Sequence, residues 1–75
     1  MSERLPALSA KQVIKIIERH GFVFARQSGS HAIYYHADGR RTTVPIHGKR
    51  TLGRGLLRQI MRDTNLDVEE LRAKN

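Results

Sequence analysis

The lack of cysteine is the feature that most constrains how this chain of 75 residues can fold. A domain of this size buries only about 60% of the surface that its unfolded chain exposes, and many small folds reinforce such a core with disulfides or a thiolate-bound zinc ion. Both are excluded here, as is a cysteine nucleophile. We therefore expect residues 1–75 to form one domain that is held together by apolar side chains alone.

Residues 9–21 are predicted to form an amphipathic helix. Ser9 and Gln12 have the spacing of a capping box, and Gly21 supplies the left-handed residue that commonly ends a helix. The apolar stripe has helical spacing and consists of Val13, Ile14 and Ile17, and Ile16 either widens this stripe or is partly exposed.

Three strands are predicted next, because stretches rich in β-branched and aromatic residues alternate with turn signals. Gly29 and Gly39 mark the two turns. Pro45 cannot donate a ladder hydrogen bond, so the third strand is expected to lie at an edge of the sheet or to end there. The predicted strands cover residues 22–26, 30–36 and about 41–46.

A second helix is predicted over residues 54–64, where leucine, isoleucine and methionine repeat on one side. The opposite side carries Arg54, Arg58 and Arg62. Asn65 ends this helix, and Asp67 with Glu70 predicts a second capping box over a short turn.

The fold class that follows is α+β, in the order α-β-β-β-α. We expect a three-stranded antiparallel sheet with both helices on one face, which leaves the other face open to solvent or to a partner. Double-stranded-RNA-binding domains share this order and size, although a shared fold does not establish a shared function.

The net charge of +7 is concentrated in one third of the chain. Residues 39–62 contain no acid and hold seven basic residues, mostly arginine, which form bidentate phosphate contacts. They are Arg40, Arg41, Lys49, Arg50, Arg54, Arg58 and Arg62. This concentration favours a polyanionic partner, and the alternative is a solvated surface that keeps a small protein soluble.

Membrane insertion and secretion are not expected. No apolar run approaches the roughly 20 residues needed to span a bilayer, and residues 1–5 lack the basic-then-apolar pattern of a signal peptide. A fold without disulfides suits a reducing compartment, so we expect a cytoplasmic protein.

Four histidines are the side chains whose reference pKa lies near neutrality. His20 is expected to cap the first helix, His36 to lie on the surface, and His47 to lie in the basic loop within reach of a phosphate. His31 follows the turn at Gly29 directly, and both a structural and a catalytic role are open to it. Whether it faces the helices or the open side depends on the register of its strand.

A metal site is not expected. His31 and His36 are five residues apart on a strand, so their side chains point to opposite faces. Every acidic residue except Asp38 lies in or beside a helix or near a terminus, so no carboxylate cluster for magnesium is predicted. A nuclease built on this chain would use histidine acid–base chemistry with the RNA 2′-hydroxyl as nucleophile, and would need no cofactor.

The segment 26–31, Arg-Gln-Ser-Gly-Ser-His, resembles the R-Q-x-G-S-H motif of the HicA toxins, which are YcfA-like mRNA interferases. The resemblance covers about residues 9–66 and includes further matches in the same order. These are His20-Gly21-Phe22, Asp38-Gly39-Arg40, Val44-Pro45-Ile46-His47, and Leu52, Gly55 and Leu57 through Ile60.

The resemblance implies a double-stranded-RNA-binding-like fold, cleavage of mRNA, and neutralisation by a HicB-type antitoxin protein. It also implies that the histidine of the G-S-H motif, His31, is catalytic. Leu56 stands where the family usually has threonine, so a hydroxyl at that position is missing.

Three functions are therefore compared. The first is an endoribonuclease toxin in which His31 is catalytic. Its substrate-binding residues would be Arg26, Ser30, Lys49, Arg50, Arg54 and Arg58. The second is an RNA-binding module without catalysis, and the third is a DNA-binding protein that uses the helix at 54–64. The third is disfavoured because a helix-turn-helix needs adjacent helices, and three strands intervene here.

Overall fold

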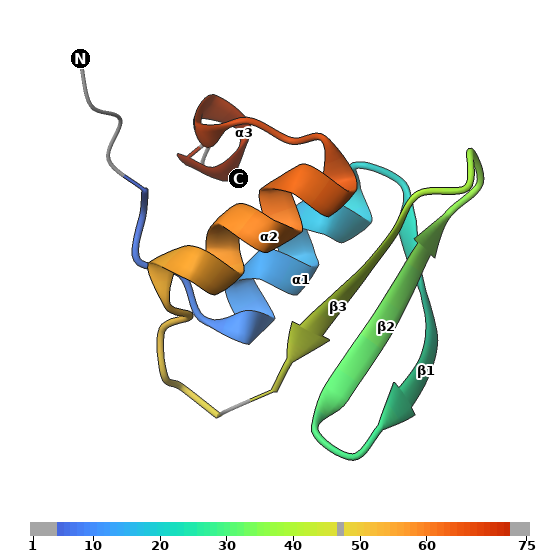
Figure 1. Cartoon of the computed structure of the whole chain (residues 1–75), viewed down its shortest axis with the longest axis horizontal. Coiled ribbons are helices and arrows are strands. Elements are labelled where there is room, and N and C mark those ends of the chain that lie inside the picture. Colours follow the sequence, from blue (N-terminus) through green and yellow to red (C-terminus); the bar gives the residue numbers. More distant parts are fainter. Residues whose placement is uncertain (1–4, 47, 73–75) are drawn as a thin grey trace.

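The computed structural model describes residues 5–46 and 48–72 of the chain. Its elements are α1 (Ala10–Arg19), β1 (Phe22–Ser28), β2 (His31–His36), β3 (Arg41–Pro45), α2 (Arg54–Thr64) and α3 (Val68–Arg72). The strands form one antiparallel sheet in the order β1-β2-β3, and α1 and α2 pack against one of its faces (Figure 1). The predicted α+β class and the order α-β-β-β-α are confirmed, and β3 is an edge strand as expected from Pro45.

Local capping signals determine both ends of α1. Ser9 accepts a hydrogen bond from the Gln12 backbone, and the Gln12 side chain accepts one from the Ser9 backbone, which completes the predicted capping box. At the other end the ring nitrogen Nδ1 of His20 lies 2.9 Å from the carbonyl oxygen of Ile16. Gly21 follows with a φ of +94°, as predicted for the residue that ends this helix.

The core lies between the helices and the sheet. Its most deeply buried apolar side chains come from the three helices and from β1 and β3, and are Val13, Ile17, Phe22, Val44, Leu57, Ile60 and Leu71. Ile16 is buried and thus widens the apolar stripe of α1, which is one of the two alternatives predicted for it, whereas Ile14 is only half-buried. The short helix α3 also packs against α1.

The C-terminal part of the described chain completes this core. Asn65 ends α2 in the left-handed conformation with a φ of +61°, and Asp67 and Glu70 form the second predicted capping box. The short turn that we predicted there is the helix α3, whose Val68 and Leu71 are buried. No helix of the described residues is long and apolar enough to cross a membrane.

A β-bulge in β1 determines which of its side chains face the helices. Phe24 pairs with Tyr34, but Arg26 pairs with the next residue of β2, Ile33, so that Ala25 is an extra residue in the ladder. Cross-strand partners share a face of the sheet. Strict alternation from Phe22 and Phe24 would place Arg26 on the helix side, and the bulge moves it to the opposite side.

Candidate functional site

Nine residues form the face of the sheet that the helices leave uncovered, and they lie in three cross-strand rows. The first row is Ser28, His31 and Pro45, the second is Arg26, Ile33 and Thr43, and the third is Val23, Tyr35 and Arg41. Their neighbours along the strands, including Ala32, Tyr34 and Val44, belong to the core, so alternation places these nine on the opposite side. We call these nine residues the open face.

His31 is exposed at the end of the open face where β1 turns into β2. The turn consists of Gly29 and Ser30, and Gly29 has a φ of +59°, which glycine adopts without steric strain. Gln27 donates a side-chain hydrogen bond to the Gly29 carbonyl at 3.0 Å, and the Ile46 backbone donates one to the Ser30 carbonyl at 2.6 Å. The turn that presents His31 is thus attached to the end of β3.

Ile33 and Tyr35 lie on the same side of β2 as His31, but they differ in burial. Ile33 is only 6% exposed, although the strand register places it in the middle row of the open face. Tyr35 is 45% exposed. The open face is therefore a partly apolar surface, with His31 near one end and Tyr35 near the other.

Arg26 is brought to His31 by the bulge. It pairs with Ile33 and is therefore the diagonal neighbour of His31, at a typical Cα separation of about 7 Å for such pairs. Ser28 lies directly opposite His31 in the ladder. We did not predict a role for Ser28, although the two-residue turn at Gly29 and Ser30 is the signal that could have found this pairing.

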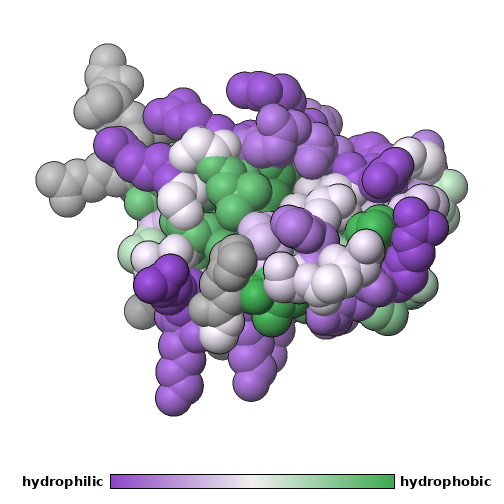
Figure 2. All heavy atoms as spheres, turned by 60° about the horizontal axis from the view of Figure 1, so that its bottom comes forward, coloured by the Kyte–Doolittle hydropathy of each residue, from purple (hydrophilic) through white to green (hydrophobic). Residues whose placement is uncertain are grey.

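The other predicted substrate-binding residues lie at different distances from His31 in the fold. Ser30 immediately precedes it in the turn, and Lys49 and Arg50 are exposed on the loop after β3. Figure 1 shows this loop and the β1–β2 turn at the same, lower end of the molecule. Figure 2 brings that end forward and shows apolar surface surrounded by projecting hydrophilic side chains. His47 lies outside the described residues.

Arg54 and Arg58 are exposed on α2, in the helical layer on the other side of the sheet from the open face. The structure therefore brings His31, Arg26 and Ser30 together and does not bring Arg54 or Arg58 to them. Roles in substrate binding for these two arginines stay predictions.

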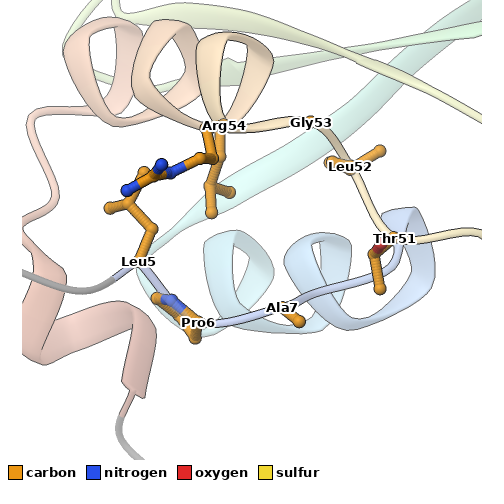
Figure 3. A pocket seen from close by; sticks show the side chains of 8 residues that line it. Leu5, Pro6, Ala7, Thr51, Leu52, Gly53 and Arg54 are labelled. Atoms are coloured by element: carbon orange, nitrogen blue, oxygen red, sulfur yellow. The ribbon is translucent and has the colours of Figure 1, made fainter.

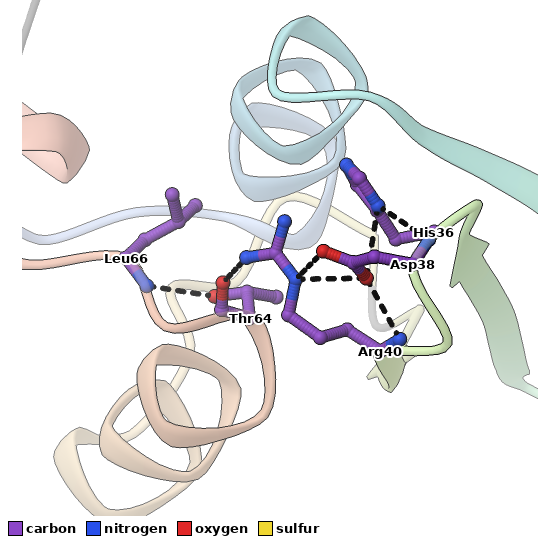
Figure 4. A network of polar contacts seen from close by, with 5 residues as sticks. All are labelled: His36, Asp38, Arg40, Thr64 and Leu66. Atoms are coloured by element: carbon purple, nitrogen blue, oxygen red, sulfur yellow. Dashed lines mark hydrogen bonds and ion pairs between the residues drawn. The ribbon is translucent and has the colours of Figure 1, made fainter.

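Arg40, one of the seven basic residues of 39–62, makes structural contacts and is not among the predicted substrate-binding residues. Its Nε donates to both carboxylate oxygens of Asp38, at 3.1 and 2.9 Å, and its guanidinium donates to the Thr64 carbonyl at the end of α2 (Figure 4). The same guanidinium lies 5.1 Å from the centre of the Phe22 ring. Hydrogen bonds from Arg40 lower the pKa of Asp38.

His36 also has a structural role, and the expectation that it is merely a surface residue is wrong. Its ring packs edge-on against Phe22 with 5.0 Å between ring centres, and its Nδ1 accepts a hydrogen bond from the Asp38 backbone at 3.1 Å. The side chain lies on the helix side of the sheet because it pairs with Phe22. His31 and His36 therefore face opposite sides, as their spacing predicted.

A hollow of about 460 Å³ lies on the helix side, between the segment that precedes α1 and the start of α2 (Figure 3). Leu5, Leu52 and Leu57 are among its lining residues, and Arg54 is its charged member. It contains no residue of the sheet and no side chain suited to proton transfer near neutral pH. The open face is therefore the stronger candidate for chemistry.

Acidic side chains are absent from the open face, whereas Arg26, Arg41 and His31 all lie on it. Within residues 5–46 and 48–72, no three side chains of histidine, cysteine, aspartate or glutamate are grouped so that they could hold a metal ion. The chemistry that this face offers is acid–base catalysis by His31 beside cationic groups that attract phosphate.

Residues 10–66 match a family model described as the HicA toxin of bacterial toxin–antitoxin systems. The chain belongs to the HicA toxin family. It is thus a toxin of a toxin–antitoxin system, and a cognate antitoxin is its partner. A search of curated proteins finds no match to the chain.

Leu56 is the position at which the sequence resemblance points to a missing hydroxyl. It lies in the first turn of α2, half-buried against the core. The N-cap of α2 is Gly53, which makes no side-chain capping bond. The start of α2 thus has neither a capping side chain at Gly53 nor a hydroxyl at position 56.

Proposed function

We propose that this HicA toxin is a metal-independent endoribonuclease that cleaves mRNA in the cytoplasm, with His31 as its catalytic residue. The observation that carries the proposal is an exposed histidine on a face of the sheet that holds two arginines and no acid. The family resemblance of the G-S-H segment supports the same residue.

The reaction uses the nucleophile that RNA itself provides. His31 takes the proton from a ribose 2′-hydroxyl, whose oxygen attacks the adjacent phosphorus while the bond to the 5′-oxygen breaks. The products are a 2′,3′-cyclic phosphate and a 5′-hydroxyl end. The leaving oxygen takes up a proton from water, and His31 afterwards returns its own proton to water. Negative charge increases on the phosphoryl oxygens in the transition state, and Arg26 stabilises it from the neighbouring position.

Other basic residues bind the RNA on either side of the reacting phosphate. Ser30 orients His31, and Lys49 and Arg50 approach from the loop beside the turn. Arg54 and Arg58 are the predicted contacts furthest from His31, and they require that the RNA pass around the edge of the sheet. A HicB-type antitoxin with an acidic surface would cover these cations and block the substrate at the same time.

Cleavage by wild type and His31→Ala in the presence of EDTA tests the proposal. Removal of a general acid or base typically slows a reaction by a factor of about 10² to 10⁴. We expect a loss of this size in the cleavage rate, with RNA affinity nearly unchanged because His31 is one of several cationic or polar contacts. Cleavage by His31→Ala at the wild-type rate would falsify the assignment.

An RNA-binding module without catalysis is the second candidate. It is favoured by one observation: among the described residues, the open face contains no second histidine and no carboxylate that would act as the partner acid. The same experiment separates the two functions. Tight RNA binding by the wild-type protein without any cleavage products would support the module.

A further inference from the structure

We propose that the open face binds single-stranded RNA, with an unpaired base stacked on Tyr35 and the RNA backbone running along β2 toward His31. Only the position of the cut relative to the stacked base rests on the proposed function. The binding surface itself is argued from the exposed side chains of β1, β2 and β3.

Two exposed apolar side chains, Val23 and Tyr35, lie side by side on the open face at the end away from His31. Among the described residues, the large hydrophobic side chains that remain exposed are Val23, Phe24 and Tyr35, at 67%, 50% and 45%. Val23 and Tyr35 are cross-strand partners on the open face, so they form one continuous patch. Clustered exposure of this kind marks a binding surface, whereas single exposed apolar residues need no explanation.

Arg41 gives this patch the chemistry of a nucleic acid site. It is the partner of Tyr35 on β3, and its guanidinium carbon lies 5.9 Å from the centre of the Tyr35 ring. Proteins that bind single strands combine aromatic rings, on which bases stack, with arginines that contact the backbone. Arg26 in the next row extends the positive charge toward His31, and no acid interrupts it.

The strand geometry indicates where the stacked base lies relative to the reacting phosphate. Tyr35 and His31 are four residues apart on the same side of β2, or about 13 Å at the usual rise of a strand. Tyr35 therefore binds a nucleotide away from the one that is cut, and it is a binding residue rather than a catalytic one.

Base stacking on this face selects an unpaired strand. The bases of a duplex are covered by their neighbours in the helix, whereas loops and single strands leave base faces free to stack on aromatic side chains. The resemblance of the fold to double-stranded-RNA-binding domains would instead suggest binding of a duplex by its shape. The exposed aromatic and arginine on the open face favour the single strand.

Binding measurements in the His31→Ala background test the proposal without cleavage of the probe. A fluorescently labelled oligouridine and a blunt RNA duplex are titrated by anisotropy into His31→Ala alone and into its Tyr35→Ala and Tyr35→Phe derivatives. We expect Tyr35→Ala to weaken oligouridine binding about 5- to 140-fold, which is the range for loss of one base stack. Tyr35→Phe keeps the ring and should bind within about twofold of its parent.

Phe24→Ala is the matched control, because Phe24 is also an exposed aromatic but faces the other side of the sheet, edge-on to Tyr34. It should leave oligouridine binding unchanged, with circular dichroism confirming that each variant is folded. Equal oligouridine affinity of the Tyr35→Ala and parent proteins would overturn the proposal, as would tighter binding of the duplex. Loss of antitoxin binding without loss of RNA binding in Tyr35→Ala would also overturn it, since the face would then be a protein interface.

The proposal and the proposed function can fail separately. If the wild-type protein does not cleave RNA but Tyr35→Ala loses oligouridine binding, single-strand binding by the open face is supported and the nuclease function is rejected. If cleavage depends on His31 but Tyr35→Ala binds oligouridine as tightly as its parent, the nuclease function is supported and base stacking on Tyr35 is rejected.

Discussion

At the residue scale, Arg40 determines how the β2–β3 connection is attached to the rest of the molecule. It contacts Asp38 within its own turn, the Phe22 ring at the start of β1, and the carbonyl of Thr64 at the end of α2. The sequence predicts the turn and the charge of Arg40. It could not predict the contact with Thr64, because the partner lies 24 residues further along the chain and depends on how α2 packs on the sheet.

Asp38→Asn should lower stability near neutral pH and have little effect in strong acid. The pKa of Asp38 is lowered in the folded protein, chiefly by its hydrogen bonds from Arg40, so its ionised form stabilises the fold at pH values above its ordinary pKa. This contribution is lost as the pH falls through the lowered pKa. Thermal melting of both proteins at a series of pH values between about 7 and 2 measures the difference.

Glu69→Gln is the control for this series. Glu69 forms an ion pair with Arg72 at 3.7 Å, but its side chain is 84% exposed, and such surface pairs contribute little. Its melting temperature should follow that of the wild type at every pH. If Asp38→Asn behaves in the same way, the network around Arg40 does not stabilise the fold.

At the element scale, two glycines lie at helix ends and differ in whether their position can accommodate a side chain. Gly53 is the N-cap of α2 with an ordinary φ of −66°, and a side chain there would meet no atom within 4 Å. Gly21 follows α1 with a φ of +94°, and a Cβ there would lie 2.8 Å from Nε2 of His36. The first position tolerates a side chain, and the second does not.

Gly53→Ser and Gly21→Ser should therefore change stability in opposite directions. Serine at position 53 supplies a capping hydroxyl and reduces the freedom of the unfolded chain, which is expected to raise the free energy of unfolding by about 0.5–1 kcal/mol. Serine at position 21 is strained and displaces His36, so a loss of at least about 1 kcal/mol is expected. Urea denaturation compares the two, and a destabilised Gly53→Ser would contradict the account of this helix end.

The helices could be predicted from sequence more fully than β1. Both capping boxes and the bounds of α2 follow from local patterns, and the structure confirms them. The bulge at Ala25 has no such signal, because the second half of β1, Arg26-Gln27-Ser28, is polar and exposed on both sides. Register is weakly specified by such a segment, so the face of Arg26 could be known only from the pairing with β2.

At the scale of the whole molecule, the positive charge divides between two sides that the sequence could not separate. Arg26 and Arg41 lie on the open face, whereas Arg54, Arg58 and Arg62 are exposed on α2 in the opposite layer. The sequence correctly predicts that one face of the sheet is left uncovered by helices. It could not predict that His31 lies on that face, because this depends on the register of β2.

Salt dependence of RNA binding shows which of the two sides contacts phosphates. For single strands each contact contributes about 0.7 to the slope of log K against log salt concentration, so Arg26→Gln with Arg41→Gln should reduce the slope by about 1.4. The matched pair Arg54→Gln and Arg58→Gln removes the same charge from α2. An unchanged slope for this second pair means that RNA binds the open face alone, and a similar reduction means that α2 also contacts the strand, as the sequence predicted.

The chemical nature of the cleaved ends tests the central claim most directly. Wild type and His31→Ala are incubated with one single-stranded RNA in EDTA, and the termini of any fragments are identified by mass spectrometry. We predict 2′,3′-cyclic phosphate and 5′-hydroxyl ends from the wild type and almost no fragments from His31→Ala. Fragments with 3′-hydroxyl and 5′-phosphate ends, or equal yields from the two proteins, would contradict attack by the 2′-hydroxyl with His31 as its acid–base catalyst.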